Sequence, residues 1–164
     1  MLALAAFALP GVAAAQVAPP RLAVRTIEQL PRPLAAPYDP AANPRAAIAA
    51  ATERARKSGK RLLIDFGANW CIDCRVFASV VELPEMRPWI ARHFELVTVD
   101  VGQFDRNLDI AARYGISLEA VPAIFVVNPQ TGKLLNRAEV LSLGDASLLT
   151  PPQMAAWLAR WAKR

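Results

Sequence analysis

Hydrophobic residues follow two different periods along this chain once residue 43 is passed. Short runs of apolar and β-branched residues predict buried strands. Two runs, residues 61–66 and 94–101, predict separate strands. Two more, residues 123–127 and 133–137, flank the turn-forming segment 128–132 and predict a hairpin.

Other segments repeat apolar residues at intervals of three or four, which predicts amphipathic helices. Asn43 and Pro44 are typical of a helix start, and Gly59 is typical of a helix end. Further helices are predicted from residue 71 to a break near residue 84, over residues 85–93 in a short or kinked form, over residues 107–114, and from residue 150 towards the C-terminus. Helices that alternate with strands predict an α/β domain with a central mixed β-sheet flanked by helices.

The first 42 residues lack this patterning. Residues 1–15 are uncharged and end in three alanines, which is typical of a signal peptide before its cleavage site, although the usual basic start is missing and we expect it upstream. Residues 16–42 are rich in proline and alanine, and we expect a leader that is extended or partly disordered. The globular domain is predicted to span residues 43–164.

Composition limits the range of functions. With 164 residues, 54% of them hydrophobic, the chain can bury one ordinary core, and we expect one globular domain. The net charge of +5 comes from basic residues spread along the sequence rather than from one block. We therefore expect a solvated, mildly basic surface and no binding of nucleic acid.

The chain has two cysteines, Cys71 and Cys74, placed directly after a predicted strand. A helix that begins at Cys71 would direct unpaired backbone N–H groups and the positive end of its dipole at that sulfur, which favours the thiolate. Cys74 would lie one turn further on the same face, within reach of a mixed disulfide at Cys71. The spacing therefore predicts a redox-active dithiol with Cys71 as nucleophile and Cys74 as resolving thiol.

Other uses of this cysteine spacing fit less well. A structural disulfide closing so short a loop would add only about 2 kcal/mol of stability. A zinc site needs four ligands, which two cysteines and the single His93 do not supply, so we expect no metal. Covalent haem attachment requires a histidine after the second cysteine, where this chain has Arg75.

The segment 65–74, which reads Asp-Phe-Gly-Ala-Asn-Trp-Cys-Ile-Asp-Cys, and the later pair Val121-Pro122 resemble the thioredoxin superfamily. The resemblance extends over roughly residues 46–164. Within the superfamily the chain is most similar to exported thioredoxin-like proteins and to the soluble domains of periplasmic thiol-disulfide interchange proteins. The fold that this implies is thioredoxin-like.

The resemblance assigns roles to several residues. The family's matching proline follows a cis peptide bond and faces the dithiol, so Pro122 is expected there, with Val121 offering its backbone to an extended substrate segment. Asp65 matches a buried carboxylate that helps to move the Cys74 proton, although an aspartate that reaches water is the alternative. Trp70 is expected either to shield the sulfurs or to be an ordinary core aromatic residue.

Asp73 lies between the two cysteines, in the first turn of the predicted helix. A carboxylate there stabilises a helix start, and its negative charge also opposes thiolate formation at Cys71. We therefore expect a reducing couple, with a potential nearer to about −270 mV than to about −120 mV.

Together these features predict an exported thiol-disulfide oxidoreductase, acting in a bacterial periplasm, that reduces protein disulfides without a cofactor. Its expected partners are disulfide-bearing proteins and a membrane or soluble thiol donor that recycles the dithiol. Two alternatives stay open at this stage: a disulfide donor or isomerase, and a non-catalytic module that binds copper(I) or another partner.

Overall fold

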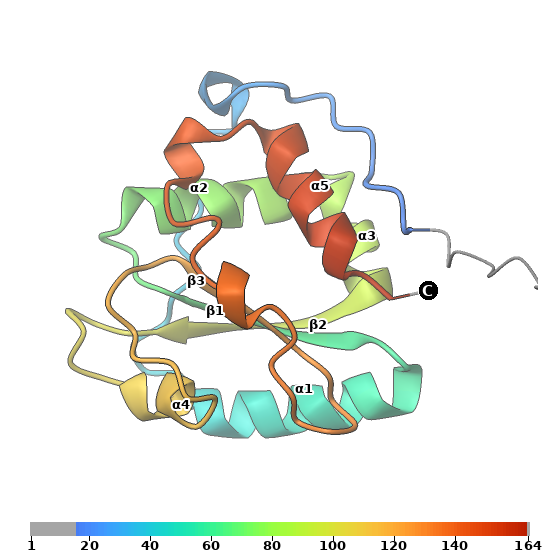
Figure 1. The fold of residues 1–164 in the computed structure, drawn as a ribbon. Helices are drawn as coiled ribbons and strands as arrows, with labels where there is room; N and C mark the ends of the chain where they lie inside the picture. The colour runs from blue at the N-terminus through green and yellow to red at the C-terminus, as the bar shows by residue number, and fades with distance from the viewer. Residues whose placement is uncertain (1–15, 164) are drawn as a thin grey trace, which may run out of the picture.

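The computed structural model describes residues 16–163, which form helices around a small mixed sheet (Figure 1). The strands are β1 (Arg61–Gly67), β2 (Phe94–Asp100) and β3 (Ala123–Val127), in the spatial order β2-β1-β3. Strand β1 runs parallel to β2 and antiparallel to β3. The predicted mixed sheet flanked by helices is thereby confirmed.

Within residues 16–163, five α-helices cover the two faces of the sheet (Figure 1). On one face lie α1 (Pro44–Ser58) and α4 (Leu108–Ala112). The other face carries α2 (Ile72–Val81), α3 (Met86–His93) and α5 (Pro151–Trp161). The described part of the chain also has three single turns of 3-10 helix: η1 (Ile27–Gln29), η2 (Arg137–Glu139) and η3 (Ala146–Leu148).

The helix termini follow the signals in the sequence. Asn43 accepts a hydrogen bond from the backbone of Ala46 at the start of α1, and Gly59 ends that helix in the left-handed conformation, with φ of 73°. At the start of α5, Thr150 and Gln153 form a capping box in which each side chain bonds the other residue's backbone.

Successive side chains along β1 point to opposite faces of the sheet, so the strand contributes to two parts of the core. Leu62, Ile64 and Phe66 belong to the cluster shared with α1 and α4. Leu63 belongs to the cluster shared with α2, α3 and α5, and Asp65 projects from that same face as a buried polar residue.

The predicted hairpin is the main correction to the expected fold. Residues 133–137 form no strand and join the sheet through one isolated bridge between Val127 and Leu134. Further along, the buried side chain of Asn136 replaces the backbone: its Oδ1 accepts from the Val126 N–H at 2.8 Å and its Nδ2 donates to the Ile124 carbonyl at 2.7 Å. A side-chain amide has the same donor and acceptor as a peptide, so the strand pattern ends early.

The leader was expected to be extended or partly disordered ahead of the domain. Residues 16–42 are indeed mostly extended, but they pack along α2, α3 and α5 (Figure 1). Leu22, Leu30 and Leu34 are buried in the same cluster as these helices, and Tyr38 is 1% exposed. A domain start at residue 43 therefore leaves out chain that completes one face of the core.

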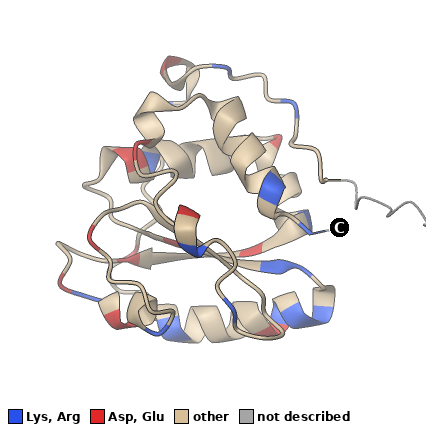
Figure 2. Ribbon diagram, viewed as in Figure 1, with Lys and Arg blue, Asp and Glu red and all other residues tan. Residues whose placement is uncertain are grey.

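Two further sequence predictions concern the surface and the N-terminus. Basic and acidic residues are interspersed over the elements, as Figure 2 shows. The predicted signal peptide, residues 1–15, lies outside the described residues. Between residues 16 and 163, no helix has the length and apolar character that crossing a membrane requires.

Candidate active site

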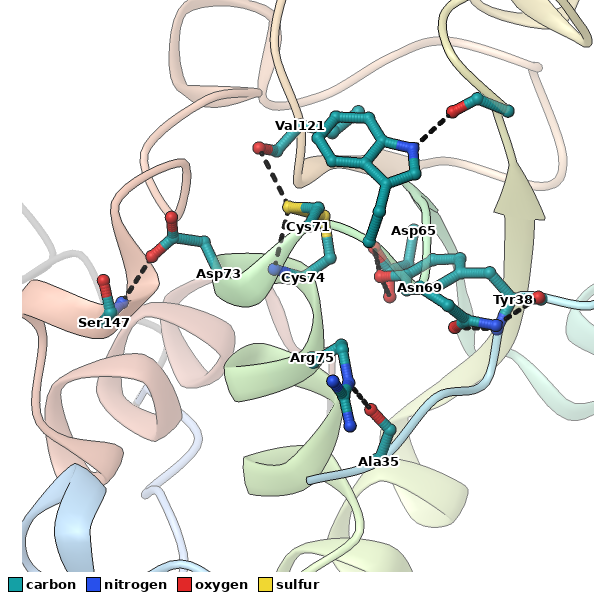
Figure 3. Close-up of a disulfide and its surroundings, with 12 residues drawn as sticks. Ala35, Tyr38, Asp65, Asn69, Cys71, Asp73, Cys74, Arg75, Val121 and Ser147 are labelled. Carbon is teal, nitrogen blue, oxygen red and sulfur yellow. Dashed lines mark hydrogen bonds between the residues drawn. A yellow bond between two sulfur atoms is a disulfide. The ribbon is translucent and has the colours of Figure 1, made fainter. Parts of the chain in front are cut away.

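The two cysteines lie at the N-terminus of α2, where β1 turns into the helix (Figure 3). Cys71 is the N-cap residue and is joined to Cys74 by a disulfide, with their Cα atoms 5.3 Å apart. The Cys71 Sγ accepts a hydrogen bond from the Cys74 N–H at 3.2 Å. A backbone donor aimed at this sulfur stabilises negative charge on it, as expected for a nucleophile at a helix start.

Burial distinguishes the two sulfurs. Cys71 is 6% exposed, whereas Cys74 is fully buried. Two half-exposed apolar residues flank Cys71, with Trp70 at 51% and Ile72 at 53% exposure. An approaching protein therefore meets Cys71 within an apolar surface and cannot reach Cys74 directly. Ile72 was not among the predicted site residues, although an apolar residue in the first turn of a helix between two cysteines was a usable signal.

Val121 faces the dithiol from the loop before β3, and Pro122 follows it in that loop (Figure 3). The peptide bond between them is cis. The Val121 carbonyl oxygen lies 3.6 Å from the Cys71 Sγ. A disulfide sulfur carries no hydrogen, so this contact becomes a hydrogen bond only when Cys71 is a protonated thiol. Substrate binding by the Val121 backbone stays a prediction.

Asp65 is 2% exposed, so the structure contradicts the alternative of an aspartate that reaches water. Burial raises the pKa of this carboxyl from 3.8 to about 7, and a hydrogen bond from Tyr38 partly opposes that rise. The Tyr38 hydroxyl lies 3.0 Å from Oδ1 and 2.9 Å from Oδ2. Sequence reasoning missed Tyr38, because it belongs to the leader and nothing near it in the sequence points to Asp65.

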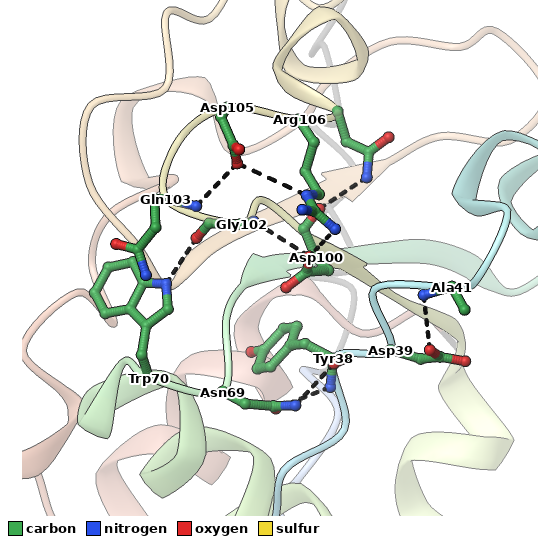
Figure 4. A network of polar contacts seen from close by, with 11 residues as sticks. Tyr38, Asp39, Ala41, Asn69, Trp70, Asp100, Gly102, Gln103, Asp105 and Arg106 are labelled. Atoms are coloured by element: carbon green, nitrogen blue, oxygen red, sulfur yellow. Dashed lines mark hydrogen bonds and ion pairs between the residues drawn. The ribbon is translucent and has the colours of Figure 1, made fainter.

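Trp70 reaches over the loop that follows β2 (Figure 4). Its Nε1 donates to the Gly102 carbonyl at 2.7 Å, and its ring centroid lies 6.1 Å from that of Phe104. With half of its surface exposed, Trp70 is not the core aromatic residue that was one of the two expectations.

The loop that holds Trp70 is itself fixed by charged side chains (Figure 4). Asp100 accepts from the Gly102 N–H at 3.2 Å and lies 3.5 Å from Arg106. Asp105 accepts from the Gln103 N–H at 3.0 Å. The indole is therefore held in place by an ordered loop.

Asp73 projects from the first turn of α2 towards the C-terminal part of the chain (Figure 3). Its Oδ1 accepts a hydrogen bond from the Ser147 N–H in η3 at 2.7 Å. The carboxylate therefore connects two distant segments, in addition to the helix-start role that its position predicted. The contact was not predictable from local pattern, since 74 residues separate the partners.

No group of three or more histidine, cysteine or acidic side chains within residues 16–163 is arranged to hold a metal ion.

Known proteins with similar sequences belong to the thioredoxin-like family. The family model described as thioredoxin-like matches residues 43–129. A thioredoxin H-type from Fagopyrum esculentum is 37% identical over 76 residues, which are 46% of this chain and 58% of that protein. The chain thus spans little more than half the length of this curated relative.

Two solved structures are also similar. The crystal structure of a disulphide isomerase from Xylella fastidiosa Temecula1 has a TM-score of 0.72 and 34% sequence identity, covering 77% of this chain and 97% of the other. The oxidised DsbD C-terminal domain of Neisseria meningitidis has a TM-score of 0.43 and 27% identity, covering 57% of this chain and 83% of the other.

Proposed function

This chain belongs to the thioredoxin-like family, and we propose that it is a thiol-disulfide oxidoreductase that reduces disulfides in other proteins. One observation carries the proposal: the Cys71–Cys74 disulfide lies at a helix N-terminus, with Cys71 retaining 6% exposure and Cys74 fully buried. That arrangement separates the two tasks of disulfide exchange, because only the outer sulfur can meet a substrate.

In the first step, the Cys71 thiolate of the reduced protein attacks one sulfur of a substrate disulfide. The substrate S–S bond breaks, a Cys71–substrate disulfide forms, and the departing substrate thiolate takes a proton from water. The Cys74 N–H and the helix terminus favour the thiolate that starts this step. Trp70 and Ile72 provide the apolar surface on which the substrate rests.

In the second step, Cys74 gives its proton to the Asp65 carboxylate and attacks the Cys71 Sγ. The mixed disulfide breaks, the second substrate sulfur leaves and takes up a proton, and the Cys71–Cys74 disulfide forms. Two electrons have then passed from the protein to the substrate. A carboxyl with a pKa of about 7 suits this role, because it can hold or release a proton near neutral pH.

The cycle requires a second partner that returns two electrons to the Cys71–Cys74 disulfide. We propose that this partner is a protein dithiol, either membrane-bound or soluble. Export to the bacterial periplasm is part of the same proposal. It is supported by the signal-like residues 1–15 and by the resemblance to exported thioredoxin-like proteins.

Isomerisation of wrongly paired disulfides is the second candidate function. It is favoured by the similarity to the protein described as a disulphide isomerase, nearly all of which aligns with this chain. Both functions begin with attack by Cys71, but an isomerase leaves the substrate with as many disulfides as before, whereas a reductase leaves it with fewer.

The deciding experiment measures both outcomes with one set of variants. We expect the wild type to reduce insulin with an external thiol as electron source, and Cys71→Ala to fall to the uncatalysed rate. Cys74→Ala should accumulate mixed disulfides with substrate proteins, and the variant lacking both cysteines should accumulate none.

Two results would count against reduction as the function. One is a wild type that refolds scrambled ribonuclease but leaves insulin intact, which would favour isomerisation. The other is a reduction potential near about −120 mV, which belongs to disulfide donors.

A further inference from the structure

The leader contributes a short segment, residues 34–38, that is bound along α2 beside the dithiol (Figure 3). We call this segment the strap. Arg75, the residue after Cys74, donates from Nη2 to the Leu34 carbonyl at 2.9 Å and from Nε to the Ala35 carbonyl at 3.1 Å. The buried Ser79 Oγ accepts from the Ala35 N–H at 2.8 Å. The helix that carries the cysteines therefore fixes the strap at three points.

The far end of the strap is held by Asn69, two residues before Cys71 (Figure 4). The Asn69 side chain accepts from the Tyr38 N–H at 3.1 Å and donates to the Tyr38 carbonyl at 2.8 Å. Gly67 leaves room for the Tyr38 ring, since a Cβ at residue 67 would lie 2.4 Å from the tyrosine Cζ. Gly67 at the end of β1 and Asn69 in the loop after it therefore both help to place the Tyr38 side chain.

The Tyr38 side chain contacts both the dithiol and the buried carboxylate. It packs in one small buried cluster with Cys71 and Cys74, and its hydroxyl reaches both carboxylate oxygens of Asp65. Burial raises the pKa of Tyr38 well above its ordinary value, so the hydroxyl stays protonated and acts as a donor throughout the physiological range.

The other elements around Asp65 present no competing charge. On α2, Cys74 packs in one buried cluster with Tyr38, and the residues paired with Asp65 are Ile124 on β3 and the neutral Thr98 on β2. The next acidic residue along β2, Asp100, is bound to the Gly102 N–H and to Arg106. Burial raises the pKa of Asp65, and the hydrogen bond from the Tyr38 hydroxyl is the interaction that opposes this rise.

We propose that Tyr38, a residue of the leader, is a positioning residue for dithiol exchange that acts by donating a hydrogen bond to the buried Asp65 carboxylate. The inference rests on the role proposed above for Asp65. A donated hydrogen bond stabilises the ionised carboxylate, which is the form that can take the Cys74 proton. Without the hydroxyl, Asp65 stays protonated at neutral pH and the second step slows.

Tyr38→Phe tests this directly, because it removes the hydroxyl and keeps the ring. The chain's other tyrosine, Tyr114, offers a matched control: it packs against Phe125 in the cluster on the opposite face of the sheet. The first readout is the carboxyl ¹³C titration of Asp65 in the oxidised protein, assigned with Asp65→Asn. We expect a midpoint near 7 in the wild type and in Tyr114→Phe, and a midpoint higher by about one to two pH units in Tyr38→Phe.

The second readout is the pH dependence of exchange between the reduced protein and a small aromatic disulfide. At pH 7 the resolving step of Tyr38→Phe should be roughly tenfold slower, and its rate should recover at higher pH. In an Asp65→Asn background, Tyr38→Phe should have no further effect on the pH profile. A merely structural role for Tyr38 would change stability but would leave the midpoint and the profile in place.

An unchanged Asp65 midpoint in folded Tyr38→Phe would overturn the inference, even if the protein reduces insulin normally. Conversely, a wild type without exchange activity would defeat the proposed function, while the titration could still be read. If Tyr38→Phe does not fold, the wild-type titration decides: the Tyr38 ring carbons must shift with the same midpoint as the Asp65 carboxyl, and their failure to do so excludes the contact.

Discussion

The two faces of the sheet are completed in different ways. One is covered by α1 and α4, helices that lie wholly after residue 43. The other is covered by α2, α3 and α5 and also by leader residues that include Leu22, Leu30 and Leu34. The sulfurs and Asp65 belong to this second face, and its cover depends on chain that has no helix or strand pattern of its own.

The comparison shows how a functional site can depend on a segment with little regular secondary structure. On the α1 face, packing alone is required, and amphipathic helices supply it. Around the dithiol, a polar group must also be placed beside a buried carboxylate, and an extended segment can follow the helix surface closely enough to do this. The following predictions, ordered by expected size, test how far the second face depends on the leader.

Removal of residues 1–42 should have the largest effect. Leu22, Leu30, Leu34 and Tyr38 lose their burial, and at about 1.5 to 3 kcal/mol each the loss is at least about 6 kcal/mol. This is comparable with the whole stability of a typical domain, so we expect loss of cooperative urea unfolding. The exposed Arg25 offers a control, since Arg25→Ala should leave the unfolding midpoint unchanged. A truncated chain with the same unfolding midpoint as the full-length chain would mean that the leader does not contribute to the stability of the core.

The second effect is a dependence of stability on pH that arises from Asp65. Its pKa is about 7 in the folded protein and 3.8 ordinarily, so between these values the folded state holds a proton that the unfolded state has lost. The free energy of unfolding should therefore fall as pH rises from about 4 to about 7, by about 4 kcal/mol in total. Urea unfolding of the wild type and of Asp65→Asn over this range measures it. Parallel curves for the two proteins would contradict the prediction.

Gly67→Ala should destabilise the protein by about 1 to 3 kcal/mol, because the added Cβ overlaps the Tyr38 ring and forces it to move. Thermal unfolding measures the loss, and the Asp65 midpoint should rise as the hydroxyl is displaced. In a Tyr38→Ala background, the same substitution should add little. Equal losses in the two backgrounds would place the strain elsewhere.

The smallest effect is expected at Asp73. Asp73→Ala removes the acceptor of the Ser147 N–H and should lower stability by about 1 kcal/mol. Asp73→Asn keeps an acceptor oxygen and should retain most of that stability, while it removes the negative charge near Cys71. The two variants separate the contact from the charge: unfolding midpoints report the first, and the reduction potential reports the second.

Local pattern was sufficient for the parts of the molecule that depend on neighbours in sequence. The strand before Cys71, the helix start at the cysteine and the caps at Asn43 and Thr150 all follow from a few adjacent residues. These features place the sulfurs, and each of them was predicted at its observed position.

Long-range polar contacts were beyond such reasoning. Tyr38 and Asp65 are 27 residues apart, and the proline-rich leader gave no period from which its course could be deduced. Asn136 ended a strand that its apolar neighbours predicted, because its side chain bonds β3 in place of the backbone. In each case one side chain, rather than a pattern, determined the local structure.

The amide of Asn136 has a consequence for self-association. Asn136 bonds the Val126 N–H and the Ile124 carbonyl on β3. The Ile124 N–H is bonded to the Val140 carbonyl, and the Val126 carbonyl to the Leu135 N–H. The backbone groups of Ile124 and Val126 that face away from β1 are therefore all occupied. An open sheet edge is a template on which a second molecule can add a strand and begin to aggregate. Asn136, together with the backbone of Leu135 and Val140, occupies this edge of β3, so β3 does not offer a free edge to a second copy of the protein.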